Sequence, residues 1–161
     1  MKRIRAILHG WLVDHAHALV GLFYGDFWGL RTAAQRHHAG FAGRLYFAYL
    51  ESLSSWIGLQ TVLDSATCFP HGIRSVFISD YARIGAGCVI YQQVTIGSVS
   101  GEGAPMIGKN VVIGAGAVIV GKCSVGDGAR IGAGAVVVKD VPAGATCVSG
   151  PMRMIERDWH E

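Results

Sequence analysis

Aliphatic residues recur at every sixth position over most of the second part of this 161-residue chain. A period of six fits neither the spacing of apolar residues on an α-helix nor the simple alternation of a β-strand. It predicts short strands joined by tight turns. Coils built of these strands stack on one another, pair backbone to backbone and bury a continuous aliphatic column. The repeat occupies Ile57, Leu63 and Phe69, then Ile78, Ile84, Ile90 and Ile96, and finally Ile107, Ile113, Ile119, Val125, Ile131 and Val137. A repeat of this kind predicts a solenoid.

Small residues accompany the aliphatic ones. Four residues after each aliphatic residue stands a small or β-branched side chain, which fits the corner of a coil. Glycine often follows the aliphatic residue directly, and we expect it to permit a left-handed turn there. Two steps are longer than six residues, with about three extra residues around 72–77 and five around 98–106. Both insertions are expected to bulge outward, and loops of this kind often carry binding residues.

The first 55 residues follow a different pattern. Apolar residues at helical spacing predict a helix over 44–53, and Gly40 and Gly43 predict breaks ahead of it. The predicted organisation is a helical segment over 1–55, a solenoid over 56–155 and a short tail over 156–161.

Four histidines of this segment are tempting metal ligands: His15, His17, His37 and His38. They lack a third ligand at a recognisable spacing, so we interpret them as solvated side chains on helix faces and predict no metal site.

Composition narrows the function further. The net charge of +3 is too small to indicate nucleic-acid binding, although a mildly basic surface suits an anionic, nucleotide-bearing ligand.

Polar residues such as Asp14 interrupt the apolar stretch that ends at Tyr24, which argues against a membrane span or a signal peptide. We expect this stretch to pack on the protein, and a peripheral contact with a membrane surface stays open. The four cysteines form no C-x-x-C pair and are interpreted as reduced core thiols, which favours a cytoplasmic location.

Several motifs in the repeats resemble those of the hexapeptide-repeat acyltransferases, and within them the serine acetyltransferases and their polysaccharide O-acetyltransferase relatives. The resemblance covers roughly residues 57–155. It implies an all-β solenoid, a left-handed parallel β-helix of about five coils, assembled as a homotrimer that uses acetyl-CoA. The motifs are Phe-Pro-His-Gly at 69–72, Ile-Tyr-Gln-Gln-Val-Thr-Ile-Gly at 90–97, Ile-Gly-Ala-Gly-Ala at 113–117 and 131–135, and Lys-Asp-Val-Pro at 139–142.

Three six-residue steps per coil place Phe69, Ile90, Ile113 and Ile131 on one face of successive coils. Two residues after each of them comes a line of four side chains, which we call the ladder: His71, Gln92, Ala115 and Ala133. A general base must take the proton of an attacking hydroxyl, and His71 is the expected base.

The neighbouring positions of the ladder receive binding roles. We expect Gln92 and Tyr91 to contact the acceptor. The small side chains of Ala115 and Ala133 leave backbone N–H groups approachable, and the resemblance implies that they contact the arm of CoA.

Three further residues are predicted to contact acetyl-CoA. The resemblance implies this role for Gly97, while Lys139 and Arg153 are candidate partners of the CoA phosphates. The loop at 98–106 is expected to reach over the site at a subunit interface.

The chain departs from the serine acetyltransferase pattern at three positions. The aspartate that precedes the histidine in that family is Pro70 here, its second active-site histidine is Ala104, and its acidic partner fifteen residues before the histidine is Trp56. The predicted function is therefore an acetyl-CoA-dependent O-acetyltransferase with a sugar or another small hydroxyl compound as acceptor. The alternatives are a divergent serine O-acetyltransferase and a non-catalytic β-helix scaffold. A carbonic anhydrase of this fold needs three histidines, and the repeats contain only His71.

Overall fold

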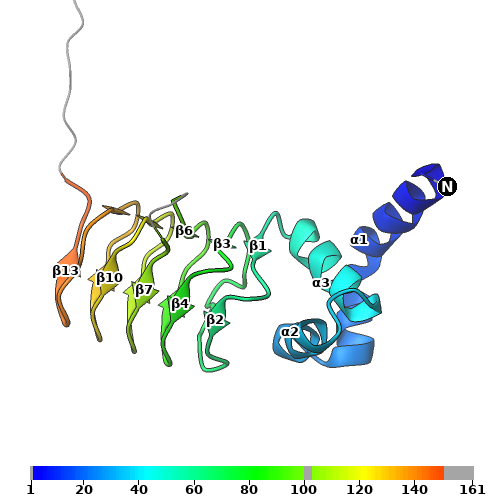
Figure 1. Cartoon of the computed structure of the whole chain (residues 1–161), viewed down its shortest axis with the longest axis horizontal. Helices are drawn as coiled ribbons and strands as arrows, with labels where there is room; N and C mark the ends of the chain where they lie inside the picture. The colour runs from blue at the N-terminus through cyan, green and yellow to red at the C-terminus, as the bar shows by residue number, and fades with distance from the viewer. Residues whose placement is uncertain (1, 100–102, 151–161) are drawn as a thin grey trace, which may run out of the picture.

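The computed structural model describes residues 2–99 and 103–150, and it consists of a helical segment followed by a β-solenoid (Figure 1). The helices are α1 (Lys2–Tyr24), α2 (Phe27–Arg36) and α3 (Phe41–Ser52). α1 buries Leu12, Ala16 and Val20, which recur at helical spacing on one face, and it packs on α3. No helix in the described part of the chain is both long enough and apolar enough to cross a membrane.

The two glycines ahead of the third helix have different roles. Gly40 is the N-cap residue of α3, as expected for a break, but the break predicted at Gly43 is wrong, because Gly43 lies inside α3. A Cβ atom at Gly43 would lie 1.8 Å from the carbonyl oxygen of His38. This glycine therefore permits a close approach of the preceding loop rather than ending the helix.

In the described part of the chain, thirteen short strands form the solenoid, and they pair in parallel along three faces. The first face has five strands: β1 (Trp56–Ile57), β3 (Phe77–Ile78), β6 (Thr95–Gly97), β9 (Val118–Val120) and β12 (Val136–Val137). The second has four: β2 (Val62–Leu63), β4 (Arg83–Ile84), β7 (Met106–Ile107) and β10 (Ser124–Val125). The third also has four: β5 (Val89–Ile90), β8 (Val112–Ile113), β11 (Arg130–Ile131) and β13 (Thr146–Cys147).

The strand register confirms the six-residue repeat. On the first face Ile57 pairs with Ile78, Ile78 with Ile96 and Ile96 with Ile119, so aliphatic side chains stack coil upon coil. Each of these four isoleucines is completely buried. The five strands of this face correspond to four complete turns between β1 and β12, and the architecture is the predicted left-handed β-helix.

The glycines of the repeat serve two purposes rather than one. Left-handed backbone occurs three residues after the aliphatic position, as at Gly116 (φ 68°) and Gly134 (φ 66°), and not at the glycines that follow it directly. Those glycines instead lie against the next coil. A Cβ atom at Gly85 would lie 2.7 Å from the carbonyl oxygen of Gly108, which leaves no room for a side chain between the stacked backbones.

The two long steps of the repeat behave differently from each other. The insertion at 72–77 does not simply bulge outward, because Ile73 and Val76 are buried and the Ser75 N–H donates to Leu53 O at 3.0 Å. It joins the first coil to the end of α3. In the insertion at 98–106, Val99 and Gly103 form an antiparallel bridge, so the described ends of that loop lie side by side.

A buried arginine connects the helices to the first coil. Arg31 of α2 is 3% exposed and donates to Tyr46 Oη at 2.7 Å, to Gly58 O at 2.9 Å and to Thr61 O at 2.7 Å. Tyr46 in turn donates to Ile57 O at 2.8 Å. Burial raises the pKa of the Tyr46 hydroxyl to about 12, against the opposing effect of the Arg31 charge.

Candidate active site

The four ladder residues occupy equivalent turns of successive coils. An isolated bridge pairs Cys68 with Val89, which places Phe69 level with Ile90, and Ile113 pairs with both Ile90 and Ile131. The turn that follows each of these strands therefore lies directly above the one before. Strands of neighbouring coils lie about 4.8 Å apart.

Each ladder turn has the same backbone form. The residue after each ladder position has a positive φ, at Gly72 (69°), Gln93 (62°), Gly116 (68°) and Gly134 (66°). Asparagine and glycine tolerate this conformation best, so Gln93 is the exception among the four. The repeated turn presents the preceding residue at the same corner of every coil.

His71 and Gln92 are in direct contact. Nδ1 of His71 lies 2.7 Å from Oε1 of Gln92, a hydrogen-bond distance. The ring of Tyr91 meets the imidazole edge to face, with ring centroids 5.6 Å apart and an interplanar angle of 80°. The side chain of His71 is exposed, whereas those of Tyr91 and Gln92 are half-buried. An exposed imidazole held by two neighbours is suited to proton transfer with a molecule that arrives from solvent.

The two alanines continue the ladder as predicted. Gln92 O accepts from Gly116 N at 3.1 Å, and Ala115 O accepts from Gly134 N at 2.9 Å, so the carbonyl groups of this corner are used between coils. Within the described residues, the N–H groups of Ala115 and Ala133 donate to no protein acceptor. Two backbone donors thus remain for a ligand that lies along the corner.

The remaining predicted cofactor contacts are not on the ladder. Gly97 ends β6 and Lys139 follows β12, so both lie after strands of the first face, whereas the ladder follows strands of the third. Lys139 is exposed, and the carboxylate of its neighbour Asp140 accepts from Ser124 N at 2.7 Å, which lowers the pKa of Asp140. Arg153 lies outside the described residues.

The three positions that depart from the serine acetyltransferase pattern lie in different surroundings. Pro70 is exposed beside His71, and Ala104 is half-buried in the described part of the long loop. Trp56 is on the first face, where it stacks on Phe47 with ring centroids 5.2 Å apart. Among the described residues, the side-chain hydrogen bond of His71 is with the amide of Gln92 and not with a carboxylate.

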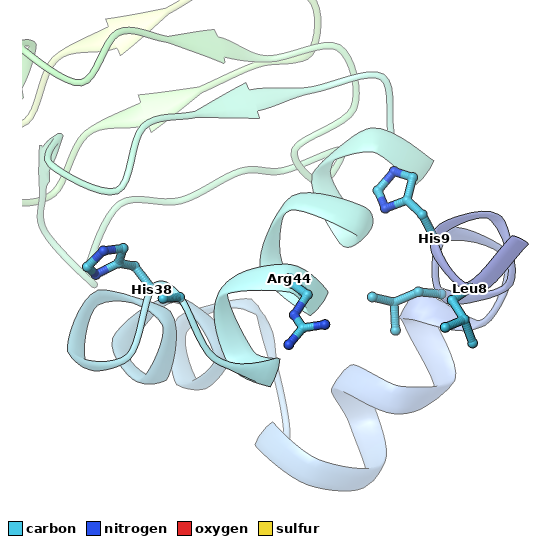
Figure 2. Close-up of a pocket in the computed structure, with 6 residues that line it drawn as sticks. Leu8, His9, His38 and Arg44 are labelled. Carbon is cyan, nitrogen blue, oxygen red and sulfur yellow. The ribbon is translucent and has the colours of Figure 1, made fainter. Parts of the chain in front are cut away.

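A separate cavity of about 590 Å³ lies among the helices, away from the ladder. Figure 2 shows His9 and Leu8 on α1, Arg44 on α3 and His38 ahead of α3 around this space. His9 is already engaged, since its Nε2 lies 2.7 Å from Oε2 of Glu51. The cavity contains none of the predicted catalytic or binding residues, so we place the candidate active site at the ladder.

The stacked coils, the six-residue repeat and the turn geometry describe a parallel β-solenoid built of six-residue repeats. A model of the family described as bacterial transferase hexapeptide (six repeats) matches residues 104–139. Part of the solenoid, residues 104–139, is therefore similar to the hexapeptide-repeat transferases.

Serine acetyltransferases are among the proteins to which the chain is similar. A serine acetyltransferase of Synechococcus elongatus is 46% identical over 90 residues, which are 54% of this chain and 36% of the relative. The crystal structure of Neisseria gonorrhoeae serine acetyltransferase in complex with serine superposes with a TM-score of 0.69 at 29% identity, over 84% of this chain and 59% of that one. The Brucella abortus enzyme in complex with coenzyme A gives a TM-score of 0.68 at 27% identity, over 80% of this chain and 52% of that one.

These matches cover only part of each relative. The chain spans about a third of the length of the Synechococcus protein and a little over half of the two crystal structures. What is similar is the solenoid and, for the structures, part of the helical segment ahead of it.

Proposed function

We propose that the chain is an acetyl-CoA-dependent O-acetyltransferase whose acceptor is the hydroxyl group of serine. The observation that carries the proposal is the exposed imidazole of His71 at the start of the ladder, in a solenoid similar to those of serine acetyltransferases. The sequence by itself favoured a sugar acceptor. Similarity to enzymes that carry serine and coenzyme A in their crystal structures gives serine the better support.

The reaction follows from a neutral imidazole beside a thioester. Nε2 of His71 takes the proton of the acceptor hydroxyl while its oxygen attacks the carbonyl carbon of acetyl-CoA. The tetrahedral intermediate then breaks its carbon–sulfur bond, which leaves the acetyl ester on the acceptor. The departing CoA thiolate takes the proton back from Nε2, so the base is regenerated.

The ladder also supplies a place for the arm of acetyl-CoA. The pantetheine portion carries amide carbonyls, and the unused N–H groups of Ala115 and Ala133 are donors of the kind that such carbonyls need. Their methyl side chains leave the corner open to an extended ligand. In this arrangement the thioester end points along the coils toward His71.

A second acceptor class is favoured by a specific observation. Pro70 precedes His71, and Ala104 takes the place of the second active-site histidine of the serine acetyltransferase pattern. Neither side chain can pair with the charged groups of a free amino acid. A neutral hydroxyl compound such as a glycoside is the second candidate.

An acceptor panel distinguishes the two candidates. The full chain is assayed for release of CoA from acetyl-CoA with serine, homoserine and a set of glycosides, and we expect the highest kcat/KM with serine. A glycoside that exceeds serine would overturn the assignment of serine while leaving the O-acetyltransferase proposal in place. Absence of acetyl transfer to every acceptor would favour the non-catalytic scaffold.

A homotrimer is part of the proposal, because the exposed ladder needs a second surface to enclose the thioester. The outward residues of the first face provide an apolar stripe: Trp56 is 46% exposed, Phe77 45% and Val136 65%. Burying them against another copy is favourable. We expect light scattering after size exclusion to give three times the chain mass at micromolar concentration, and a monomer with full activity would contradict an interface active site.

A further inference from the structure

We propose that Gln92 is a positioning residue, whose side-chain oxygen holds His71 in the tautomer that can act as a base. This inference rests on the proposed acetyltransferase function and changes the role expected of Gln92, from contact with the acceptor to orientation of the imidazole. The starting observation is the 2.7 Å distance between Nδ1 of His71 and Oε1 of Gln92.

The chemistry of the pair fixes where the proton is. The amide oxygen only accepts hydrogen bonds, so Nδ1 of His71 must be the donor and must carry the hydrogen. In the neutral ring the other nitrogen, Nε2, then has a free lone pair. A free lone pair at Nε2 is what the removal of a hydroxyl proton requires.

The backbone holds the Gln92 turn from two sides. Its neighbour Gln93 donates from its N–H to Arg74 O at 3.2 Å, in the coil of His71. On the other side, Gly116 N donates to Gln92 O at 3.1 Å. The carboxamide is therefore presented to His71 by a turn tied to both adjoining coils, and the rings of Tyr91 and His71 pack in a T-shaped arrangement. Groups held in this way lose little further freedom when they hydrogen-bond.

An amide differs from the carboxylate that usually orients a catalytic histidine. Both groups accept a hydrogen bond from Nδ1, but only a carboxylate also attracts positive charge onto the ring. Trp56 occupies the position of the family's acidic partner, and it is stacked on Phe47 instead of reaching His71. Gln92 thus supplies the orienting acceptor of this chain without placing a negative charge beside the base.

Three variants of the full chain test the inference. Gln92→Met keeps the length of the side chain but removes the strong acceptor, Gln92→Glu keeps an acceptor oxygen, and Gln93→Met makes the same change at the adjacent exposed residue. The first readout is the ¹⁵N NMR signature of the His71 ring in the neutral state, which reports the nitrogen that carries the hydrogen. The second is steady-state kinetics, with kcat and the KM for acetyl-CoA measured separately.

We expect the wild type, Gln92→Glu and Gln93→Met to show hydrogen on Nδ1, and Gln92→Met to show a mixture of both tautomers. For Gln92→Met, we expect kcat to fall about ten- to a hundred-fold and the KM for acetyl-CoA to change little. This loss is part of the rate enhancement of about 10²–10⁴-fold that a positioned general base contributes. An unchanged tautomer and an unchanged kcat in Gln92→Met would overturn the positioning role. A wild type that shows hydrogen on Nδ1 but transfers no acetyl group would instead contradict the proposed function, so the two failures are distinguishable.

Discussion

Replacing His71 with alanine is expected to lower kcat for acetyl transfer by about 100-fold or more, because a positioned general base contributes about 10²–10⁴-fold to such reactions. The side chain is exposed and its loss leaves the turn intact, since Gly72 N–H donates to Phe69 O at 2.9 Å without any help from the imidazole. We therefore expect an unchanged fold by circular dichroism. Residual turnover should remain from binding and proximity alone. The measurement is kcat and KM with acetyl-CoA and the best acceptor of the panel.

The matched control is His37→Ala, which removes another exposed imidazole from outside the solenoid. It should retain the turnover of the wild type. Equal turnover of His71→Ala and His37→Ala would rule out His71 as the base.

Replacing Arg31 with methionine is expected to lower the free energy of unfolding by about 2–4 kcal/mol. Methionine fills a similar volume but donates nothing, so the carbonyl oxygens of Gly58 and Thr61 lose their donors while they stay buried. The loss also removes the donor to Tyr46, the residue that joins α3 to Ile57 of the first strand. Urea unfolding followed by circular dichroism measures the effect.

Arg36→Met on the same helix is the control for this change. Arg36 is exposed in the last turn of α2, where a positive charge contributes less than about 1 kcal/mol. If the two variants unfold at the same urea concentration, the hydrogen bonds of Arg31 do not hold the helical segment on the solenoid.

Much of the solenoid could be predicted from the sequence because a coil is a local structure. Six residues build one strand and one turn, three such steps complete a coil, and the next coil repeats them. The stacking of Ile57, Ile78, Ile96 and Ile119 therefore follows from the repeat once the two insertions are left out of the count. The same logic places the ladder residues in line. The function of the directly following glycines was mistaken, because the left-handed conformation of a turn can be expected locally whereas the approach of Gly85 to Gly108 depends on the neighbouring coil.

The helical segment was predicted less completely. Arg31 would ordinarily be read as a solvated charge, since it stands in a short helix between ordinary helix-forming residues. Its burial depends on the carbonyl groups of Gly58 and Thr61, almost thirty residues later in the chain. The sequence around Arg31 does not indicate these hydrogen-bond acceptors. Gly43 is similar, because its lack of a side chain serves the loop at His38 and not the helix that contains it.

The sequence by itself determined the repeat, the parallel β-helix and the alignment of His71 with Gln92, Ala115 and Ala133, because the period of six makes equivalent positions recur on the same corner. Only the tertiary structure decided what Gln92 contacts. Alignment brings two side chains into neighbouring coils, but the turn geometry and the rotamers decide whether they touch. Here they bring the oxygen of the amide to Nδ1 of the imidazole at 2.7 Å, the contact on which the proposed positioning role of Gln92 rests.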